Sequence, residues 1–182
     1  MSTLFGADQI RILRTAGMSF EIHDPSGIVA LAKFRSPDPD WRNLFTVLDK
    51  HRRPGTDFVV VDPDGTSHYE INLERGWDVQ FAFRVSTSAG EAVGTGQTSG
   101  RFRMKVPTEL VDATGAPMGH TFRGRRWEAF DHSDTPVATI HQDSTAPAFG
   151  KLVHRIEFTG QVSAPLRAMI VASVVCWATN AG

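Results

Sequence analysis

The sequence predicts a mainly β fold: a closed antiparallel barrel of about twelve strands that encloses a hydrophobic C-terminal helix. Two patterns lead to this prediction, a short turn motif that recurs between strand-like runs and an apolar stretch near the C-terminus. The 182 residues, of which 41% are hydrophobic and 21% charged, suit one soluble domain with a substantial core. We therefore expect residues 1–182 to form a single domain.

The apolar stretch 164–178, APLRAMIVASVVCWA, has one charge, Arg167, and one hydroxyl, Ser173. A helix that is apolar on all sides must be enclosed by protein or by lipid. At 1.5 Å per residue the stretch reaches roughly 22 Å, short of the roughly 30 Å hydrocarbon core of a membrane. With Ser163 as N-cap, we predict a central buried helix over 164–179. Its β-branched residues leave a strand as the alternative.

Two side chains of this helix carry chemistry. Arg167 lies in the first turn, so we expect its guanidinium to reach water at the mouth of the barrel. On this basis Arg167→Leu would leave stability nearly unchanged. Cys176 is the only cysteine, which excludes an intrachain disulfide and a cysteine-rich metal site. Its apolar surroundings predict an inert buried thiol.

The recurrent motif is a four-residue turn that begins with Asp or Thr and ends, in all copies but the last, with Gly. An Asp side chain accepts hydrogen bonds from its own turn, and Gly in the fourth position adopts positive φ. Five hairpins supply ten strands, and flanking runs at 10–15 and 151–158 raise the number to about twelve. A β-sandwich with an appended helix is the alternative. The turns are Asp24-Pro-Ser-Gly27, Asp62-Pro-Asp-Gly65, Thr87-Ser-Ala-Gly90, Asp112-Ala-Thr-Gly115 and Asp131-His-Ser-Asp134.

Two segments interrupt the hairpins. In 38–51, apolar residues at i, i+3, i+4 and i+7 from Trp41 predict a short amphipathic helix across the barrel or its mouth. We interpret it as a lid on the core, with a partner-binding helix as the alternative. The glycine-rich segment 94–100 resembles a phosphate loop but has no lysine after its last glycine. We interpret it as a bend or bulge of the barrel wall.

No catalytic or metal-binding pattern is present. The histidines lack the spacing of metal ligands, and no serine lies in a G-x-S-x-G motif. We therefore predict no enzyme activity, no metal and no cofactor. Each histidine is interpreted as a polar surface or turn residue. They are His23, His51, His68, His120, His132, His141 and His154.

Cations form the one candidate binding site on a chain whose formal net charge is −1. Alternation along a strand would bring three to one face, and three more cluster about twenty residues later. If these strands are neighbours, their common face can bind anionic headgroups or phosphorylated ligands. A solvated face with interleaved carboxylates is the alternative. The predicted site comprises Arg101, Arg103, Lys105, Arg123, Arg125 and Arg126, with Lys33 and Arg35 as further contributors.

The repeated turns, the segment GRRWEAFD at 124–131 and the hydrophobic C-terminal helix together resemble the LURP-one-related and phospholipid-scramblase proteins of the tubby C-terminal-like superfamily. The resemblance covers nearly the whole chain from about residue 10. It implies a twelve-stranded closed barrel threaded by the helix. It also implies membrane tethering through phosphoinositides or lipid scrambling. The proline-rich N-terminus, cysteine cluster and Asp-rich calcium loop of scramblases are missing here, which argues against scrambling.

We therefore expect a non-enzymatic binding module that docks on anionic phospholipid or a phosphorylated ligand through its basic face. One alternative is a scramblase-like lipid-handling protein or apolar-ligand carrier, and another is a structural or interaction domain. The near-neutral charge and the absence of aromatic residues between the cations argue against nucleic acid. The start of the chain lacks signal-peptide features, so we expect a cytoplasmic protein that associates peripherally with membranes.

Overall fold

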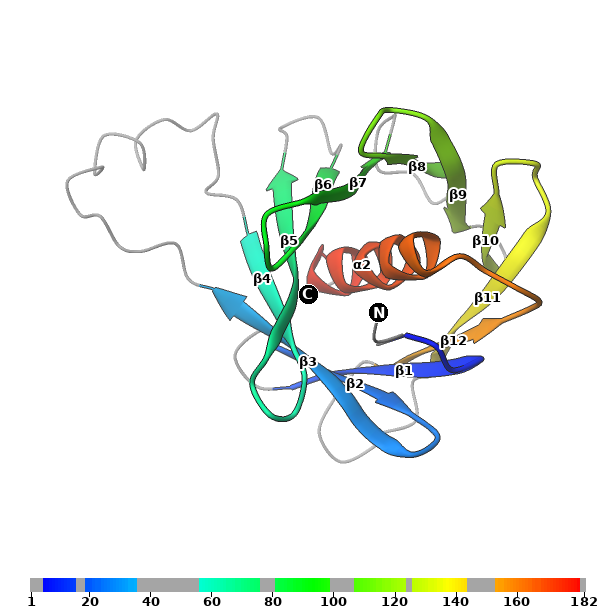
Figure 1. Ribbon diagram of the computed structural model, residues 1–182. Helices are drawn as coiled ribbons and strands as arrows, with labels where there is room; N and C mark the ends of the chain where they lie inside the picture. Colours follow the sequence, from blue (N-terminus) through cyan, green and yellow to red (C-terminus); the bar gives the residue numbers. More distant parts are fainter. Residues whose placement is uncertain are drawn as a thin grey trace.

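A computed structural model of the chain describes residues 5–15, 19–35, 56–75, 81–98, 107–123, 126–143 and 153–180. Over these ranges it confirms the predicted fold class, with twelve strands and the C-terminal helix (Figure 1). The predicted helix over 38–51 lies outside the described residues. The elements are β1 (Gln9–Arg14), β2 (Phe20–Asp24), β3 (Gly27–Arg35), β4 (Thr56–Val61), β5 (Ser67–Arg75), β6 (Phe81–Thr87), β7 (Ala92–Thr98), β8 (Pro107–Asp112), β9 (Pro117–Arg123), β10 (Trp127–Asp131), β11 (Pro136–Asp143), β12 (Val153–Phe158) and α2 (Ala164–Asn180).

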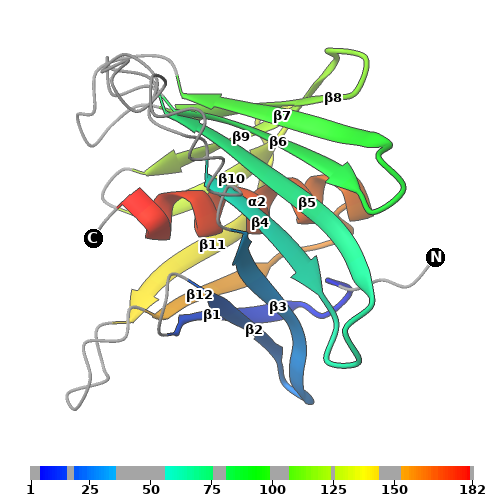
Figure 2. The same cartoon turned by 90° about the vertical axis from the view of Figure 1, so that its left-hand side faces the viewer.

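The sheet is a closed antiparallel meander. Each strand pairs with its neighbours in sequence, and β1 pairs with β12, with Ile10 opposite Ile156. Closure leaves the barrel without free edges, so the sandwich alternative is wrong. The strands surround α2, which crosses the interior (Figures 1 and 2).

Successive connections of an up-and-down barrel alternate between its two ends. The five tight turns therefore lie at one end, which we call the turn end, and α2 begins there after β12. The connections that follow β1, β3, β5, β7, β9 and β11 belong to the other end, which we call the far end. The last turn of α2 reaches this far end, where Trp177 lies near Arg123 of β9.

The turns form as the sequence predicts. In the turn at residues 112–115, Asp112 Oδ1 accepts hydrogen bonds from the backbone N–H groups of Thr114 (2.8 Å) and Ala116 (2.9 Å). The Thr114 hydroxyl also donates to this oxygen and is the main reason that the pKa of Asp112 lies below its usual value. Gly115 has φ 86°, and Asp134 takes the equivalent left-handed place in the last turn at φ 60°.

The helix is off-centre, because the inward side chains of the barrel wall are small on one side and large on the other. It packs against β6, β7, β8 and β9. On this wall a Cβ at Gly94 would lie 2.3 Å from the Val111 carbonyl oxygen and 3.2 Å from Met169 Sδ of the helix. A Cβ at Gly96 would lie 2.2 Å from the Phe83 ring. These two glycines therefore make room for the helix and for an aromatic ring.

The interpretation of 94–100 as a bend or bulge fits only the start of the segment, where a register shift against β6 adjoins Gly94. From Gly94 to Thr98 the chain is a strand that pairs in regular register with β8. A register shift between β6 and β7 falls just before it, beside Val85 and Ser86. The glycines are required by packing across the barrel, which the local pattern does not reveal.

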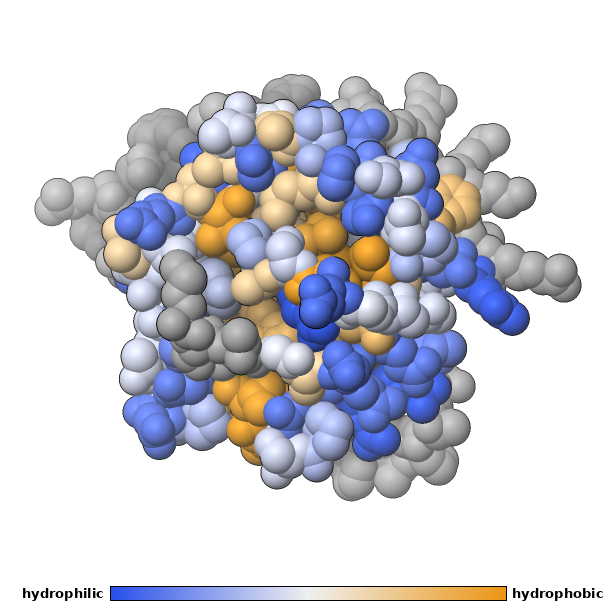
Figure 3. Space-filling model, turned by 45° about the vertical axis from the view of Figure 1, so that its right-hand side comes forward, coloured by the Kyte–Doolittle hydropathy of each residue, from blue (hydrophilic) through white to orange (hydrophobic). Residues whose placement is uncertain are grey.

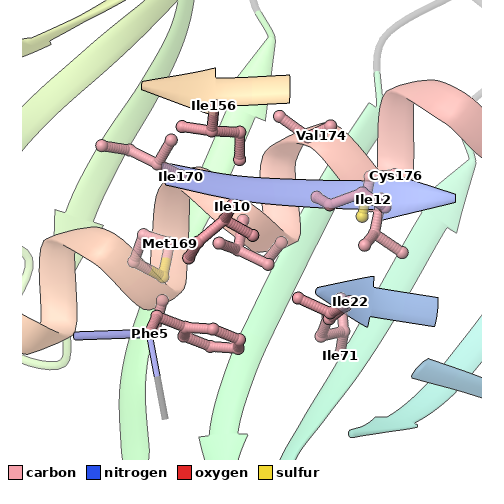
Figure 4. Close-up of a cluster of buried hydrophobic side chains, with 14 of the residues drawn as sticks. Phe5, Ile10, Ile12, Ile22, Ile71, Ile156, Met169, Ile170, Val174 and Cys176 are labelled. Atoms are coloured by element: carbon pink, nitrogen blue, oxygen red, sulfur yellow. The ribbon is translucent and has the colours of Figure 1, made fainter. Parts of the chain in front are cut away.

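Large apolar side chains fill the space on the other side of the helix (Figure 4). They come from β1 to β5 and β12, and they meet Met169, Ile170 and Val174 of α2. From Leu166 to Thr179 every helix residue is buried. Ser173, the one hydroxyl that the apolar stretch contains, shares a hydrogen bond with Thr121 of β9 at 3.1 Å. The wall side chains include Ile10, Ile12, Phe20, Ile22, Phe58, Ile71 and Ile156.

The environment of the Arg167 side chain differs from the one predicted from the sequence. Its guanidinium does not extend into water but is mostly covered by protein, and the residue is 8% exposed. Nη1 donates to the carbonyl oxygens of Phe5 (3.0 Å) and Ala7 (2.7 Å), and Nε donates to that of Val162 (3.3 Å). The Phe158 ring lies 4.4 Å from Cζ. The chain before β1 folds back over the start of α2, so the head group is covered where water was expected.

We therefore expect Arg167→Leu to lower the free energy of unfolding by about 2 kcal/mol, since buried carbonyl groups lose their donor. Urea denaturation followed by circular dichroism measures this loss. The matched control is Arg84→Leu, at an exposed position of β6, which should stay within about 0.5 kcal/mol of the wild type. Equal denaturation midpoints for Arg167→Leu and Arg84→Leu would contradict the structural role of Arg167.

Candidate functional site

Two of the six predicted cations lie in the described structure, and both are at the far end. Arg123 ends β9, and Arg126 is exposed immediately before β10. The other members, Arg101, Arg103, Lys105 and Arg125, lie outside the described residues, so the single basic face stays a prediction.

Lys33 and Arg35 do not join this site. Both lie on β3, which the strand order places half-way round the barrel from β9. Arg35 instead forms an ion pair with Glu70, at 3.6 Å between Nη1 and Oε1. The prediction that these two residues contribute to the basic cluster is wrong, because the circular order of the strands separates them.

Arg123 does not belong to the outer face of the barrel. It shares the inward face of β9 with Thr121, which contacts α2. Its guanidinium carbon lies 5.4 Å from the Trp177 ring centre and 5.7 Å from that of Trp127, distances typical of cation–π interactions. Nη2 donates to Gln142 Oε1 at 3.3 Å. Arg123 therefore covers the far end of the helix.

His154 is the residue that sequence reasoning missed. It lies on the inward face of β12, is 3% exposed, and its ring is perpendicular to that of Trp127 at 5.6 Å between centres. Burial, and to a smaller extent the positive charge of Arg123, lower the pKa of His154 to about 4. The alternation of His154, Ile156 and Phe158 along the strand is the signal that would have found it.

The other described histidines match the prediction of surface or turn residues. His23 Nε2 lies 3.1 Å from a Glu21 carboxylate oxygen, and His68 Nε2 lies 3.1 Å from one of Asp62. His132 is exposed in a turn. His51 lies outside the described residues.

Two buried nitrogens of this region, Trp127 Nε1 and His154 Nδ1, have no hydrogen-bond partner among the residues that the structure describes. Unsatisfied buried polar atoms are uncommon in folded proteins, because each loses its hydrogen bonds to water. We call Arg123, Trp127, Gln142, His154 and Trp177 the far-end cluster. It combines a guanidinium with aromatic faces, and the guanidinium is the group suited to recognition of an anion.

The guanidinium of this cluster is not neutralised within the described part of the chain. There Arg123 forms no ion pair, whereas Arg155 faces Glu157 (3.4 Å) and Arg167 faces Asp8 (3.5 Å). Arg123 donates a hydrogen bond to an uncharged carboxamide and lies against two aromatic rings. A cation held in this way retains its attraction for a negatively charged ligand.

Within the described ranges the structure contains no group of three or more His, Cys, Asp or Glu side chains placed to hold a metal ion. Cys176 is buried in α2, as the sequence predicts. In the same ranges, no helix has both the length and the apolar character needed to cross a membrane.

Comparison with known proteins found no match among family models, curated proteins or solved structures. The resemblance to the LURP-one-related and scramblase proteins therefore stays a prediction. What the structure has in common with the architecture that the resemblance implies is the twelve-stranded closed barrel around a C-terminal helix.

Proposed function

We propose that this protein is a non-enzymatic binding module that docks an anionic phosphate-bearing headgroup at the far end of its barrel. The observation that carries the proposal is Arg123, a guanidinium fixed between two tryptophan rings and a carboxamide without a carboxylate partner among the described residues. A planar guanidinium donates two parallel hydrogen bonds to a phosphate. Because it is already held in place, little side-chain entropy is lost on binding.

Further cations close to Arg123 in the sequence support a binding site at the far end. Arg126 is exposed close to Arg123, and Arg125 lies between them in the chain. Residues 99–106, which contain Arg101, Arg103 and Lys105, connect β7 to β8. We therefore keep all six predicted cations as members of the proposed site. Each cation adds about 1 kcal/mol to attraction by an anionic membrane surface.

A carrier that holds an apolar ligand inside the barrel is a weaker candidate. The interior is occupied by α2, whose residues from Leu166 to Thr179 are all buried. Such a ligand would have to displace the helix and the contacts that stabilise it. We therefore propose binding at the surface, with a phosphoinositide or phosphatidylserine membrane as the first candidate partner.

Vesicle co-sedimentation tests the proposal. We expect wild-type protein to pellet with vesicles that contain phosphoinositide or phosphatidylserine, but not with neutral vesicles. Binding should weaken as salt rises, since exposed charges are screened beyond about 8 Å at physiological ionic strength. The double variant Arg123→Gln/Arg126→Gln should lose about 2 kcal/mol, roughly thirtyfold in partition coefficient.

The matched control is Lys33→Gln/Arg35→Gln, which removes the same charge half-way round the barrel. It should bind like the wild type. A soluble inositol phosphate that competes with the vesicles would show that the headgroup itself is recognised. Equal pelleting of the wild type and the far-end double variant, or equal pelleting with neutral vesicles, would overturn the proposal.

A further inference from the structure

A pocket of about 600 Å³ opens at the turn end, where α2 begins. This volume is typical of sites for small organic ligands. Figure 3, which looks obliquely onto this end, shows hydrophobic residues around a hydrophilic one near the centre of the face, with mostly hydrophilic residues farther out. The residues that matter for the argument are Phe5, Asp8, Tyr69, Val162, Ser163 and Arg167. We propose that this turn-end pocket binds an organic carboxylate with an apolar tail.

The pocket has one cation in its lining, Arg167, and one mobile counter-charge at its rim, the exposed Asp8. Arg167 lines it from the first turn of α2, where the helix N-terminus already carries a partial positive charge. No acidic residue occupies that first turn. The carbonyl groups of Phe5, Ala7 and Val162 satisfy the guanidinium hydrogen bonds but carry no net charge. An anion that replaces Asp8 here is therefore attracted by both the Arg167 side chain and the helix N-terminus.

Asp8 indicates where a ligand carboxylate would bind. Its Oδ1 lies 3.5 Å from Arg167 Nη2, longer than the roughly 2.7–2.9 Å of a strong charge-assisted hydrogen bond. The Asp8 side chain is 87% exposed, so it is free to move into solvent. A carboxylate that enters the pocket can take its place beside Nη2 and form a closer pair in less polar surroundings.

The apolar part of the pocket suits a hydrocarbon tail. Phe5 stacks on Tyr69, with ring centres 5.9 Å apart, and Val162 packs against the core beside them. Burial also raises the pKa of Tyr69, so its hydroxyl keeps its proton and can donate to an anion. The lining thus joins aromatic surface to a cation, the combination that an amphipathic carboxylate requires.

This site is independent of the proposed function, because the two lie at opposite ends of the barrel. Isothermal titration calorimetry with octanoate tests it, with octan-1-ol and octylammonium as ligands of similar length. We expect octanoate to bind at least about tenfold more tightly than either. Equal binding of the alcohol, or no binding of octanoate at millimolar concentration, would overturn the proposal.

Substitutions inside and outside the pocket test whether octanoate binds there. Ala164→Phe, at an exposed position that lines the pocket, should weaken octanoate binding at least about tenfold by filling the space. The matched control is Ala113→Phe, exposed in the turn between β8 and β9, which should leave the affinity unchanged. Asp8→Ala should raise the affinity, since it removes the internal competitor. Equal affinity of the two Phe variants, or weaker binding by Asp8→Ala, would contradict the assignment.

The two ends can also be told apart. Arg123→Gln/Arg126→Gln should bind octanoate like the wild type, and saturating octanoate should not displace the protein from anionic vesicles. Loss of octanoate binding in that far-end variant would overturn the turn-end site while leaving the vesicle result to stand on its own.

Discussion

Deletion of residues 164–182 should abolish cooperative unfolding and leave an insoluble or molten chain. The helix supplies a large part of the core, and the strands direct apolar side chains such as Ile10, Phe20 and Phe58 into the same interior. Each large apolar side chain that loses its burial costs roughly 1.5–3 kcal/mol. The summed cost for the many core side chains affected exceeds the roughly 5–15 kcal/mol stability of a typical domain. Circular dichroism during urea denaturation, together with binding of a hydrophobic dye, measures the outcome.

A milder variant keeps this prediction testable if the truncated chain cannot be purified. Met169→Asp places an unpaired charge at a position of α2 that is 0% exposed, and we expect a loss of several kcal/mol, roughly 4. The matched control is Ile28→Asp, since Ile28 is 45% exposed on β3. A sharp unfolding transition for the truncated chain would contradict the core role of α2. Recovery of the intact protein only from detergent-extracted membranes would do so as well.

The second large effect is a loss of folding stability at acid pH that is caused by His154. The pKa of His154 is about 4 in the folded state, compared with the ordinary histidine value of 6.5 in the unfolded chain. As the pH falls through 6.5, the unfolded state binds a proton that the folded state does not bind until about pH 4. The stability contributed by the neutral ring is therefore fully present above pH 6.5 and lost between pH 6.5 and about 4. The expected loss is about 3 kcal/mol.

Chemical denaturation across this pH range, for the wild type and His154→Leu, isolates the effect. The variant lacks the titrating ring, so its free energy of unfolding should fall by about 3 kcal/mol less than that of the wild type. His132→Leu is the control, because His132 is exposed in a turn. Its profile should follow the wild type. Parallel profiles for His154→Leu and the wild type would show that the buried ring does not resist protonation.

Local chemistry explains why the fold was predictable. An aspartate such as Asp112 bonds to its own turn, and Gly115 accepts positive φ, whatever lies elsewhere in the chain. An apolar helix must be enclosed, and five hairpins with a flanking strand on each side supply the enclosure. Fold class, strand number, turn positions and the burial of Cys176 therefore followed from short-range patterns.

The candidate sites were less predictable, because they depend on which strands meet. Arg123 was predicted on an outer face but lies over Trp127 and Trp177, which come from other elements. His154 was predicted at the surface, although alternation along β12 already indicated its inward direction. The signal existed for His154 but was outweighed by the usual exposure of histidine, whereas nothing local indicated the contacts of Arg123.

The sequence by itself determined a closed barrel of about twelve hairpin-linked strands around a C-terminal helix, since turn chemistry and hydrophobic burial act on neighbouring residues. The tertiary structure alone decided that Arg167 is covered by the chain before β1, that Gly94 and Gly96 make room across the interior, and that Lys33 lies far from Arg123. Each of these outcomes depends on contacts between residues distant in the chain. Such contacts are set by strand order and side-chain volume, and neither can be read from a local pattern.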